Sequence, residues 1–174
     1  LRAFSQCSAS WPDVQLVVAG DGAPGYVAGL KALSVELGLD DSVVWAGHID
    51  GDLKVSALMG AELFVLPSFS ENFGIAAAEA LMAGLPCVLG QGVAIAQDVV
   101  NAGAGVAVAP DPASIAAGLK RVMADVQVRA GMAVRASALA REKYSAQAMG
   151  ANLVALYEDL LGRRNPPASE MTGI

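Results

Sequence analysis

The sequence predicts an α/β protein whose parallel sheet is flanked by helices, and three observations predict it. Short aliphatic runs alternate with longer segments of helical periodicity along most of the chain. The aliphatic runs lack the polar alternation of half-exposed strands, so we expect both faces of the sheet to be covered. The 174 residues suit one domain, because domains average roughly 150 residues. We expect this domain to span residues 1–162 and to be followed by a flexible tail, residues 163–174.

The predicted elements follow one another in a regular order. The segment 1–8 is expected to be helical, and Asp111 followed by Pro112 is typical of a helix start. The expected strands are residues 14–19, 43–46, 63–66, 87–89 and 106–109. The expected helices between and after them are residues 27–37, 53–59, 75–83, 115–124, 128–143 and 146–161.

The helical start departs from the usual order of a doubly wound sheet, which opens with a strand that becomes central. We therefore expect this sheet to lack its first strand and to expose unpaired strand edges. Exposed edges favour a homodimer, strand exchange or a gap covered by a helix.

Composition excludes several classes of protein. The chain is 55% hydrophobic but only 5% aromatic, which indicates an ordered aliphatic core rather than disorder. The net charge is −6 and the basic residues are scattered, so nucleic acid is not an expected partner. The longest uncharged stretch, residues 80–97, contains Pro86 and three glycines, so no transmembrane segment is expected.

The cysteines and the first residues indicate a compartment. Cys7 and Cys87 lie far apart with no metal-site spacing and no disulfide framework, so both are expected to be reduced. Residues 1–11 do not resemble a secretory signal. A cytoplasmic location is the expectation.

A glycine-rich turn follows the first predicted strand. Residues 20–25 fit G-x-G-x-x-G between a strand and a helix, where amides could approach a phosphate. A dinucleotide site would also need an acidic residue after the next strand, but Gly47, His48 and Ile49 stand there. A turn whose glycines relieve crowding is therefore favoured over an NAD site.

Two carboxylates eight positions apart give a sharper signal. Glu71 lies in the loop after a predicted strand, where open α/β sheets bind ligands. Glu79 lies on the apolar side of the helix that follows, among alanines that supply no hydrogen-bond donors. A ligand diol could supply two donors, and the free amides at the helix start would suit a diphosphate. The alternative is that Glu71 is a solvated loop residue and Glu79 caps a neighbouring backbone.

The stretch from Pro67 to Pro86 reads P-S-x-x-E-x-F-G-x-x-x-x-E-A-x-x-x-G-x-P and resembles the E-x7-E signature of retaining GT-B glycosyltransferases, in particular glycosyltransferase family 4 (group 1). Residues 12–22, 37–39 with 43–47, 102–108 and 153–161 resemble other parts of the same family. The resemblance implies the C-terminal, donor-binding half of a GT-B fold, which is a three-layer Rossmann-like domain. It also implies a nucleotide sugar, UDP- or GDP-linked, as substrate.

The resemblance also implies roles for individual residues. Glu71 would be the catalytic residue that faces the transferred sugar, and Glu79 would grip the ribose hydroxyls. The sugar and diphosphate would meet Asn72, Phe73, Gly74 and Ile75, the base would be bordered by Gly47, His48 and Ile49, and Gly20 and Gly22 would leave room for the phosphates. For the His48 side chain, packing or solvent exposure is favoured over a role in the chemistry.

Several family features are missing from this sequence. The Arg and Lys that neutralise the leaving diphosphate have no counterpart, and neither has the N-terminal acceptor-binding domain. The loop 90–98 lacks the family's Gly-Gly and later Glu, for which Gln97 or Asp98 could substitute. No metal is expected, because Asp50-Gly51-Asp52 reads as a helix start and not as a metal-binding D-x-D.

Three functions remain as alternatives. The favoured one is the donor-binding domain of a retaining, metal-independent glycosyltransferase, incomplete and inactive as an isolated chain. The second is a binding or assembly module with the same fold, and the third is an NAD-dependent oxidoreductase domain. A parent glycosyltransferase could also sit peripherally at the inner membrane surface.

Overall fold

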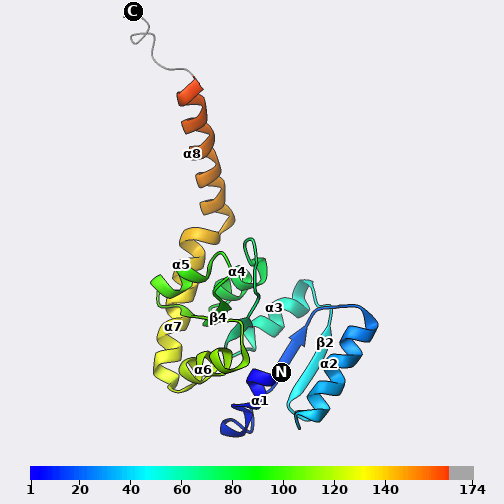
Figure 1. Cartoon of the computed structure of the whole chain (residues 1–174). Helices are drawn as coiled ribbons and strands as arrows, with labels where there is room; N and C mark the ends of the chain where they lie inside the picture. Colours follow the sequence, from blue (N-terminus) through cyan, green and yellow to red (C-terminus); the bar gives the residue numbers. More distant parts are fainter. Residues whose placement is uncertain (165–174) are drawn as a thin grey trace, which may run out of the picture.

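The computed structural model describes residues 1–164, which form an α/β fold with parallel strands between layers of helices (Figure 1). All five predicted strands form, and so do the predicted helices. The strands are β1 (Leu16–Ala19), β2 (Val43–Gly47), β3 (Phe64–Leu66), β4 (Cys87–Gly90) and β5 (Gly105–Val108). The helices are α1 (Arg2–Ser5), η1 (Ser8–Ser10), α2 (Pro24–Glu36), α3 (Gly51–Met59), α4 (Ile75–Met82), α5 (Ala96–Asn101), α6 (Pro112–Met123), α7 (Val126–Leu139), η2 (Ala140–Tyr144) and α8 (Ala146–Arg164).

The strands form two separate parallel sheets. One has the order β1-β2 with Leu16 opposite Val43, and the other has the order β3-β4-β5 with Cys87 opposite Gly105. Within the described residues, no strand pairs with the second edge of β1 or of β3.

The two sheets differ in how their faces are covered. Every residue of β4 is buried, as expected for a strand covered on both faces. The expectation is wrong for the smaller sheet, where Val17 is 52% and Val44 40% exposed. Residues at alternate positions in β1 and β2 face solvent, because only one face of this sheet is packed against a hydrophobic cluster.

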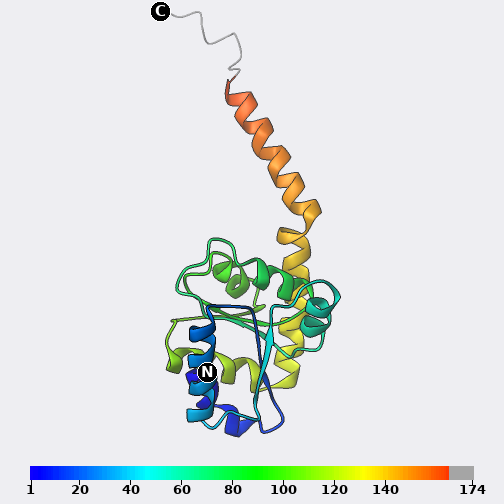
Figure 2. The ribbon, with the colours of Figure 1, turned by 90° about the vertical axis from the view of Figure 1, so that its right-hand side faces the viewer.

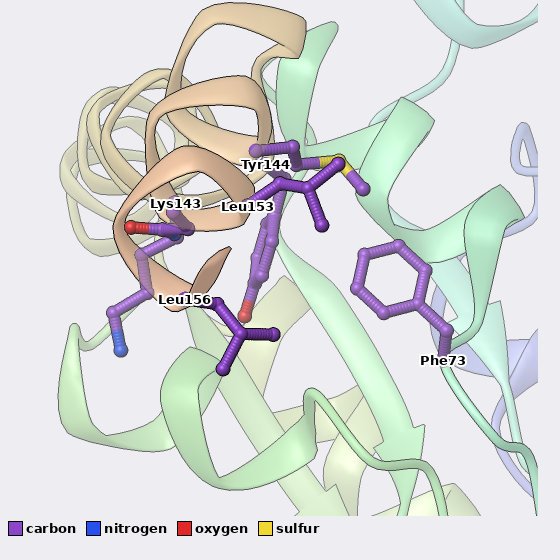
Figure 3. A pocket seen from close by; sticks show the side chains of 7 residues that line it. Phe73, Lys143, Tyr144, Leu153 and Leu156 are labelled. Carbon is purple, nitrogen blue, oxygen red and sulfur yellow. The ribbon is translucent and has the colours of Figure 1, made fainter. Parts of the chain in front are cut away.

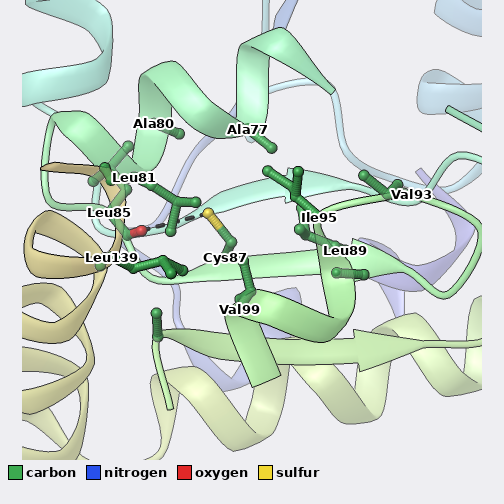
Figure 4. Packing of buried hydrophobic residues seen from close by; sticks show 14 residues of the cluster. Ala77, Ala80, Leu81, Leu85, Cys87, Leu89, Val93, Ile95, Val99 and Leu139 are labelled. Atoms are coloured by element: carbon green, nitrogen blue, oxygen red, sulfur yellow. Dashed lines mark hydrogen bonds between the residues drawn. The ribbon is translucent and has the colours of Figure 1, made fainter. Parts of the chain in front are cut away.

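The main core fills one face of the larger sheet. Cys87 and Leu89 pack against residues of α4, α5 and α7, among them Leu81, Val99 and Leu139 (Figure 4). The Cys87 thiol donates a hydrogen bond of 3.4 Å to the Leu85 carbonyl, and its burial raises its pKa to about 12. Cys87 is therefore a reduced core residue, as Cys7 is, and both cysteines are free and buried.

The N-terminal segment joins the two sheets on the opposite face. Phe4 packs with Leu39 and Val43 against the smaller sheet. Cys7 packs with Val88 and with residues of β5 and α6 against the larger sheet. The helix expected over residues 1–8 is thus confirmed as α1 and η1, and it packs beneath both halves of the molecule.

The C-terminal helices follow the predicted order. Asp111 accepts a hydrogen bond of 2.9 Å from the Ser114 amide and caps α6. The helix α7 continues into η2, and Ser145 then adopts an extended conformation before α8 begins. Figures 1 and 2 both show α8 projecting from the body of the molecule. Of the predicted tail, residues 165–174 lie outside the described residues.

No helix among residues 1–164 is both long and apolar enough to cross a membrane.

Candidate functional site

The motif loop, residues 67–74, connects β3 to α4 and is braced by the loop that follows β4. The Glu71 amide donates to the Gly92 carbonyl at 3.1 Å, and the Ala94 amide donates to the Glu71 carbonyl at 3.1 Å. Glu71 and Val93 therefore form a parallel bridge. The Glu71 side chain is exposed, so its backbone is fixed while its carboxylate is free to meet a ligand.

Two glycines allow this close approach of loop to loop. A Cβ at Gly90 or at Gly92 would collide with the carbonyl oxygen of Ser68 or of Phe69, respectively. The sequence prediction noted that this loop lacks the family's Gly-Gly, but it did not foresee this role for the two glycines. The signal in the sequence was the spacing of Gly90 and Gly92 at the end of a buried strand.

Gly74 turns the motif loop into α4. Its φ of +82° is a conformation that glycine adopts without strain, and a Cβ there would lie 3.0 Å from the Cγ1 atom of Val93. The Gly74 carbonyl accepts from the amides of Ala77 and Ala78. An α-helix leaves its first amides without partners inside the helix, and those of α4 follow the motif loop directly.

Glu79 lies one turn further along α4 and is paired. The Lys54 ammonium, on α3, donates to Oε1 of Glu79 at 2.6 Å, and the two side chains are 38% and 36% exposed. The expectation that no donor lies near Glu79 is therefore wrong. Sequence reasoning missed Lys54 because the contact between α3 and α4 joins residues 25 positions apart, for which the sequence carries no signal.

The motif loop has two aromatic side chains, and of these Phe69 is exposed whereas Phe73 packs on the C-terminal helices. Its ring meets Tyr144 edge to face, with centroids 5.6 Å apart and planes at 88°. The Tyr144 hydroxyl donates to Asp98 at 2.7 Å, and the Lys143 ammonium donates to the same carboxylate at 2.7 Å. The hydrogen bond from Lys143, followed by that from Tyr144, lowers the pKa of Asp98. Burial and the Asp98 carboxylate raise the pKa of Tyr144.

The remaining predicted residues gather at the ends of β1 and β2. The Gly20 amide donates to the Gly47 carbonyl at 2.7 Å, and both glycines have positive φ angles. The His48 side chain is 69% exposed. Gly22 and Ile49 lie in the same two loops. The loop after β2 leads into α3, so the pair of Lys54 and Glu79 links this cluster to the motif loop.

Two open pockets flank the motif loop. The first, of about 360 Å³, is lined by Phe73 and Tyr144 and by residues of α8 (Figure 3). The second, of about 540 Å³, is lined by Gly92 and Val93 and by residues of α5. Neither is lined by Glu71 or Glu79, of which Glu71 is exposed in the motif loop and Glu79 is 36% exposed on α4.

The described residues contain no group of three or more His, Cys, Asp or Glu side chains that could hold a metal ion. Asp50 occupies the first position before α3, as the sequence suggested, but its side chain makes no capping hydrogen bond.

A family model described as "Glycosyl transferases group 1" matches residues 1–138. Among curated relatives, an uncharacterized glycosyltransferase of Methanocaldococcus jannaschii is 38% identical over 77 residues, which are 44% of this chain and 19% of that protein. A D-inositol 3-phosphate glycosyltransferase of a Mycobacterium species is 35% identical over 86 residues, which are 48% of this chain and 20% of that protein. The chain thus matches only about a fifth of the length of these relatives.

Solved structures share the fold. Sucrose-phosphate synthase from Thermosynechococcus elongatus superposes with a TM-score of 0.79 at 23% identity, over 93% of this chain and 42% of that one. HepE from Anabaena, solved in complex with UDP and glucose, superposes with a TM-score of 0.78 at 24% identity, over 90% of this chain and 43% of that one.

Proposed function

Since this chain belongs to the glycosyl transferases group 1 family and has the GT-B type of fold, we propose that it binds the nucleotide sugar in a retaining glycosyltransferase. The observation that carries the proposal is the placement of Glu71 and Glu79. One is exposed on a loop with a fixed backbone, and the other is oriented by Lys54 on the helix that the loop opens.

Each part of the site has a proposed partner on the ligand. Glu79 would accept hydrogen bonds from the two ribose hydroxyls, and Glu71 would face the transferred sugar. The backbone of Asn72, Phe73 and Gly74, with the first amides of α4 at Ile75, would receive the sugar and the diphosphate, because helix amides favour anions. The loops at Gly20, Gly22, Gly47, His48 and Ile49 would border the phosphates and the base.

The proposed reaction is departure of a nucleoside diphosphate from the anomeric carbon and attack by an acceptor hydroxyl on the same face of the sugar. Preorganised amides and charges would stabilise the leaving diphosphate, and no metal is invoked. Enclosing the sugar and positioning an acceptor call for more protein surface than the open pockets of residues 1–164 provide. We therefore propose that transfer requires further polypeptide of the kind that the longer relatives contain. The proposed location is cytoplasmic, in line with two free, buried cysteines.

The test is ligand-observed NMR of the chain with UDP, GDP, ADP and NAD in competition. We expect saturation transfer to one nucleoside diphosphate and a loss of about tenfold or more in affinity for Glu79→Ala, because hydrogen bonds to a charged group contribute about 1.5–3 kcal/mol. Glu62→Ala is the matched control, since Glu62 is an exposed glutamate whose partner is Arg129.

Three outcomes would contradict the proposal. Binding of NAD above any diphosphate would favour the oxidoreductase, and no binding at all would favour an assembly module. Equal losses of affinity in Glu79→Ala and Glu62→Ala would show that Glu79 is not part of the binding site.

A further inference from the structure

We propose that Tyr144 is a positioning residue for the motif loop, acting through the ring of Phe73. The inference rests on the proposed function, because it concerns how the chain holds the loop that would meet the sugar and the diphosphate. Tyr144 lies about seventy positions from that loop in the sequence, at the end of η2.

The Tyr144 ring has a fixed place. Its hydroxyl donates to Oδ2 of Asp98 at 2.7 Å, while Lys143 donates to Oδ1 of the same carboxylate at 2.7 Å. Asp98 lies on α5, directly after the loop whose Gly92 and Ala94 hold the backbone of Glu71. Residues 92–98 thus hold the motif loop in two ways. They form backbone hydrogen bonds with Glu71, and they fix the Tyr144 ring that contacts Phe73.

The Phe73 ring packs in part on the main core and also borders an open pocket of about 360 Å³. Tyr144 lines this pocket together with Met149, Leu153 and Leu156 of α8, and Figure 3 shows Phe73 facing Tyr144 and the two leucines across it. The edge-to-face contact with Tyr144 is the one aromatic pair found among the described residues. Without the Tyr144 ring, we expect Phe73 to move into the pocket and to carry Asn72 and Gly74 with it.

Tyr144 also stands at the start of the projecting helix. Ser145 follows it in an extended conformation with ψ of 152°, and its hydroxyl oxygen accepts from the Ala148 amide at 3.1 Å. The first turn of α8 is therefore tied to the residue next to Tyr144. A change in the direction of α8 would therefore act on the Tyr144 ring and, through it, on the motif loop.

The experiment compares Tyr144→Leu and Tyr144→Phe with the matched control Tyr157→Leu, which changes a tyrosine of α8 that is 58% exposed. The affinity of each chain is measured by NMR titration for UDP and uridine, or for GDP and guanosine if that base is preferred. The backbone amide signals of residues 71–74 are followed without ligand.

We expect Tyr144→Leu to weaken binding of the diphosphate about two- to tenfold, the range for loss of one aromatic pair. Binding of the nucleoside should stay within about twofold, because Glu79 and the β2 loop do not depend on Phe73. Tyr144→Phe should keep most of the affinity, since it retains the ring, and Tyr157→Leu should behave as the parent chain.

Two results would overturn the inference. One is an equal loss for nucleoside and diphosphate, which would indicate general destabilisation. The other is amide signals of residues 71–74 that do not move in Tyr144→Leu, and this result decides the question even if no nucleotide binds. Absence of nucleotide binding to the parent chain with moved amide signals would instead reject the proposed function alone.

Discussion

The ion pair between Lys54 and Glu79 is short, yet both side chains are more than a third exposed. Pairs of this kind contribute only about 0–1 kcal/mol to stability, because solvent screens the attraction and ordering two long side chains costs entropy. Its value to the molecule therefore lies in orientation. The ion pair holds the Glu79 carboxylate in one direction on a helix in which the residues next to Glu79 are alanines.

Lys54→Met should leave the free energy of unfolding within about 1 kcal/mol of the parent value and weaken nucleotide binding about two- to tenfold, since ordering a flexible side chain on binding costs about 0.5–1.5 kcal/mol. Urea denaturation and NMR titration measure the two quantities. Lys120→Met, at an exposed lysine of α6, is the control. If Lys54 acts through Glu79, adding Lys54→Met to Glu79→Ala should cause no further loss, and a further loss would refute this.

Asp98 makes stability depend on acid. Lys143 and Tyr144 lower its pKa in the folded chain, so the stabilisation is present above the unfolded value of about 3.9 and is lost as pH falls through the folded pKa. Asp98→Asn should therefore lower the unfolding free energy by on the order of 1 kcal/mol at pH 7, with the difference from the parent shrinking below about pH 4. Urea denaturation at pH 7 and below about pH 4 measures this difference, and Asp13→Asn, at an exposed aspartate, is the control. A difference that does not change with pH would contradict it.

Among the elements, the motif loop has its backbone held in place by the loop that follows β4. The backbone pairing of Glu71 with the Gly92 and Ala94 segment is possible because Gly90 and Gly92 carry no side chain. The geometry of the candidate site thus depends partly on residues 90–94, which lie outside the motif.

Gly92→Ala should destabilise the chain by about 1–3 kcal/mol and displace the motif loop, because the new Cβ would collide with the Phe69 carbonyl and backbone must shift. Thermal unfolding and the amide spectrum of residues 69–74 report both effects. Gly150→Ala is the matched control in α8, where a Cβ meets nothing within 4 Å and helix propensity predicts a gain of up to about 1 kcal/mol. Equal behaviour of the two variants would argue against the close packing.

Local sequence patterns predicted the helices and strands better than they predicted the contacts between them. The strands and the cap at Asp111 followed from aliphatic runs and from the Asp-Pro pair, which are short-range signals. The helix α5, six residues long, was missed, because it is too short to show a helical period. The two carboxylates were found through their spacing, whereas Lys54 and Tyr144 were not, since each reaches the site by tertiary packing.

At the scale of the whole molecule, the two sheets are joined by side chains and not by backbone hydrogen bonds between strands. Phe4 and Cys7 pack against the two sheets on one face, and Lys54 reaches Glu79 from α3 to α4. Among the described residues each sheet has two edge strands, β1 and β2 in the smaller sheet and β3 and β5 in the larger one.

Free parallel edges are templates for another strand, so a homodimer through β1 or β3 stays a prediction of this fold. We expect sedimentation equilibrium to detect self-association that Val17→Lys weakens, because a charge on an edge strand opposes pairing. Val134→Lys, at a residue of α7 that is 72% exposed, is the control for added charge. A chain that stays monomeric at millimolar concentration would reject the dimer.

The split between the two sheets also divides the molecule into two units, one around each sheet. Each unit can unfold locally while the other stays folded. Native-state hydrogen exchange should show amides of β1 and β2 exchanging through a smaller opening than those of β4, whose strand is buried on both faces and paired on both edges. The loops at Gly20 and Gly47 belong to the less protected unit, while Glu71 and Glu79 belong to the more protected one. A nucleotide that contacts both units would hold them together, and its binding would be measured as slower amide exchange in β1 and β2.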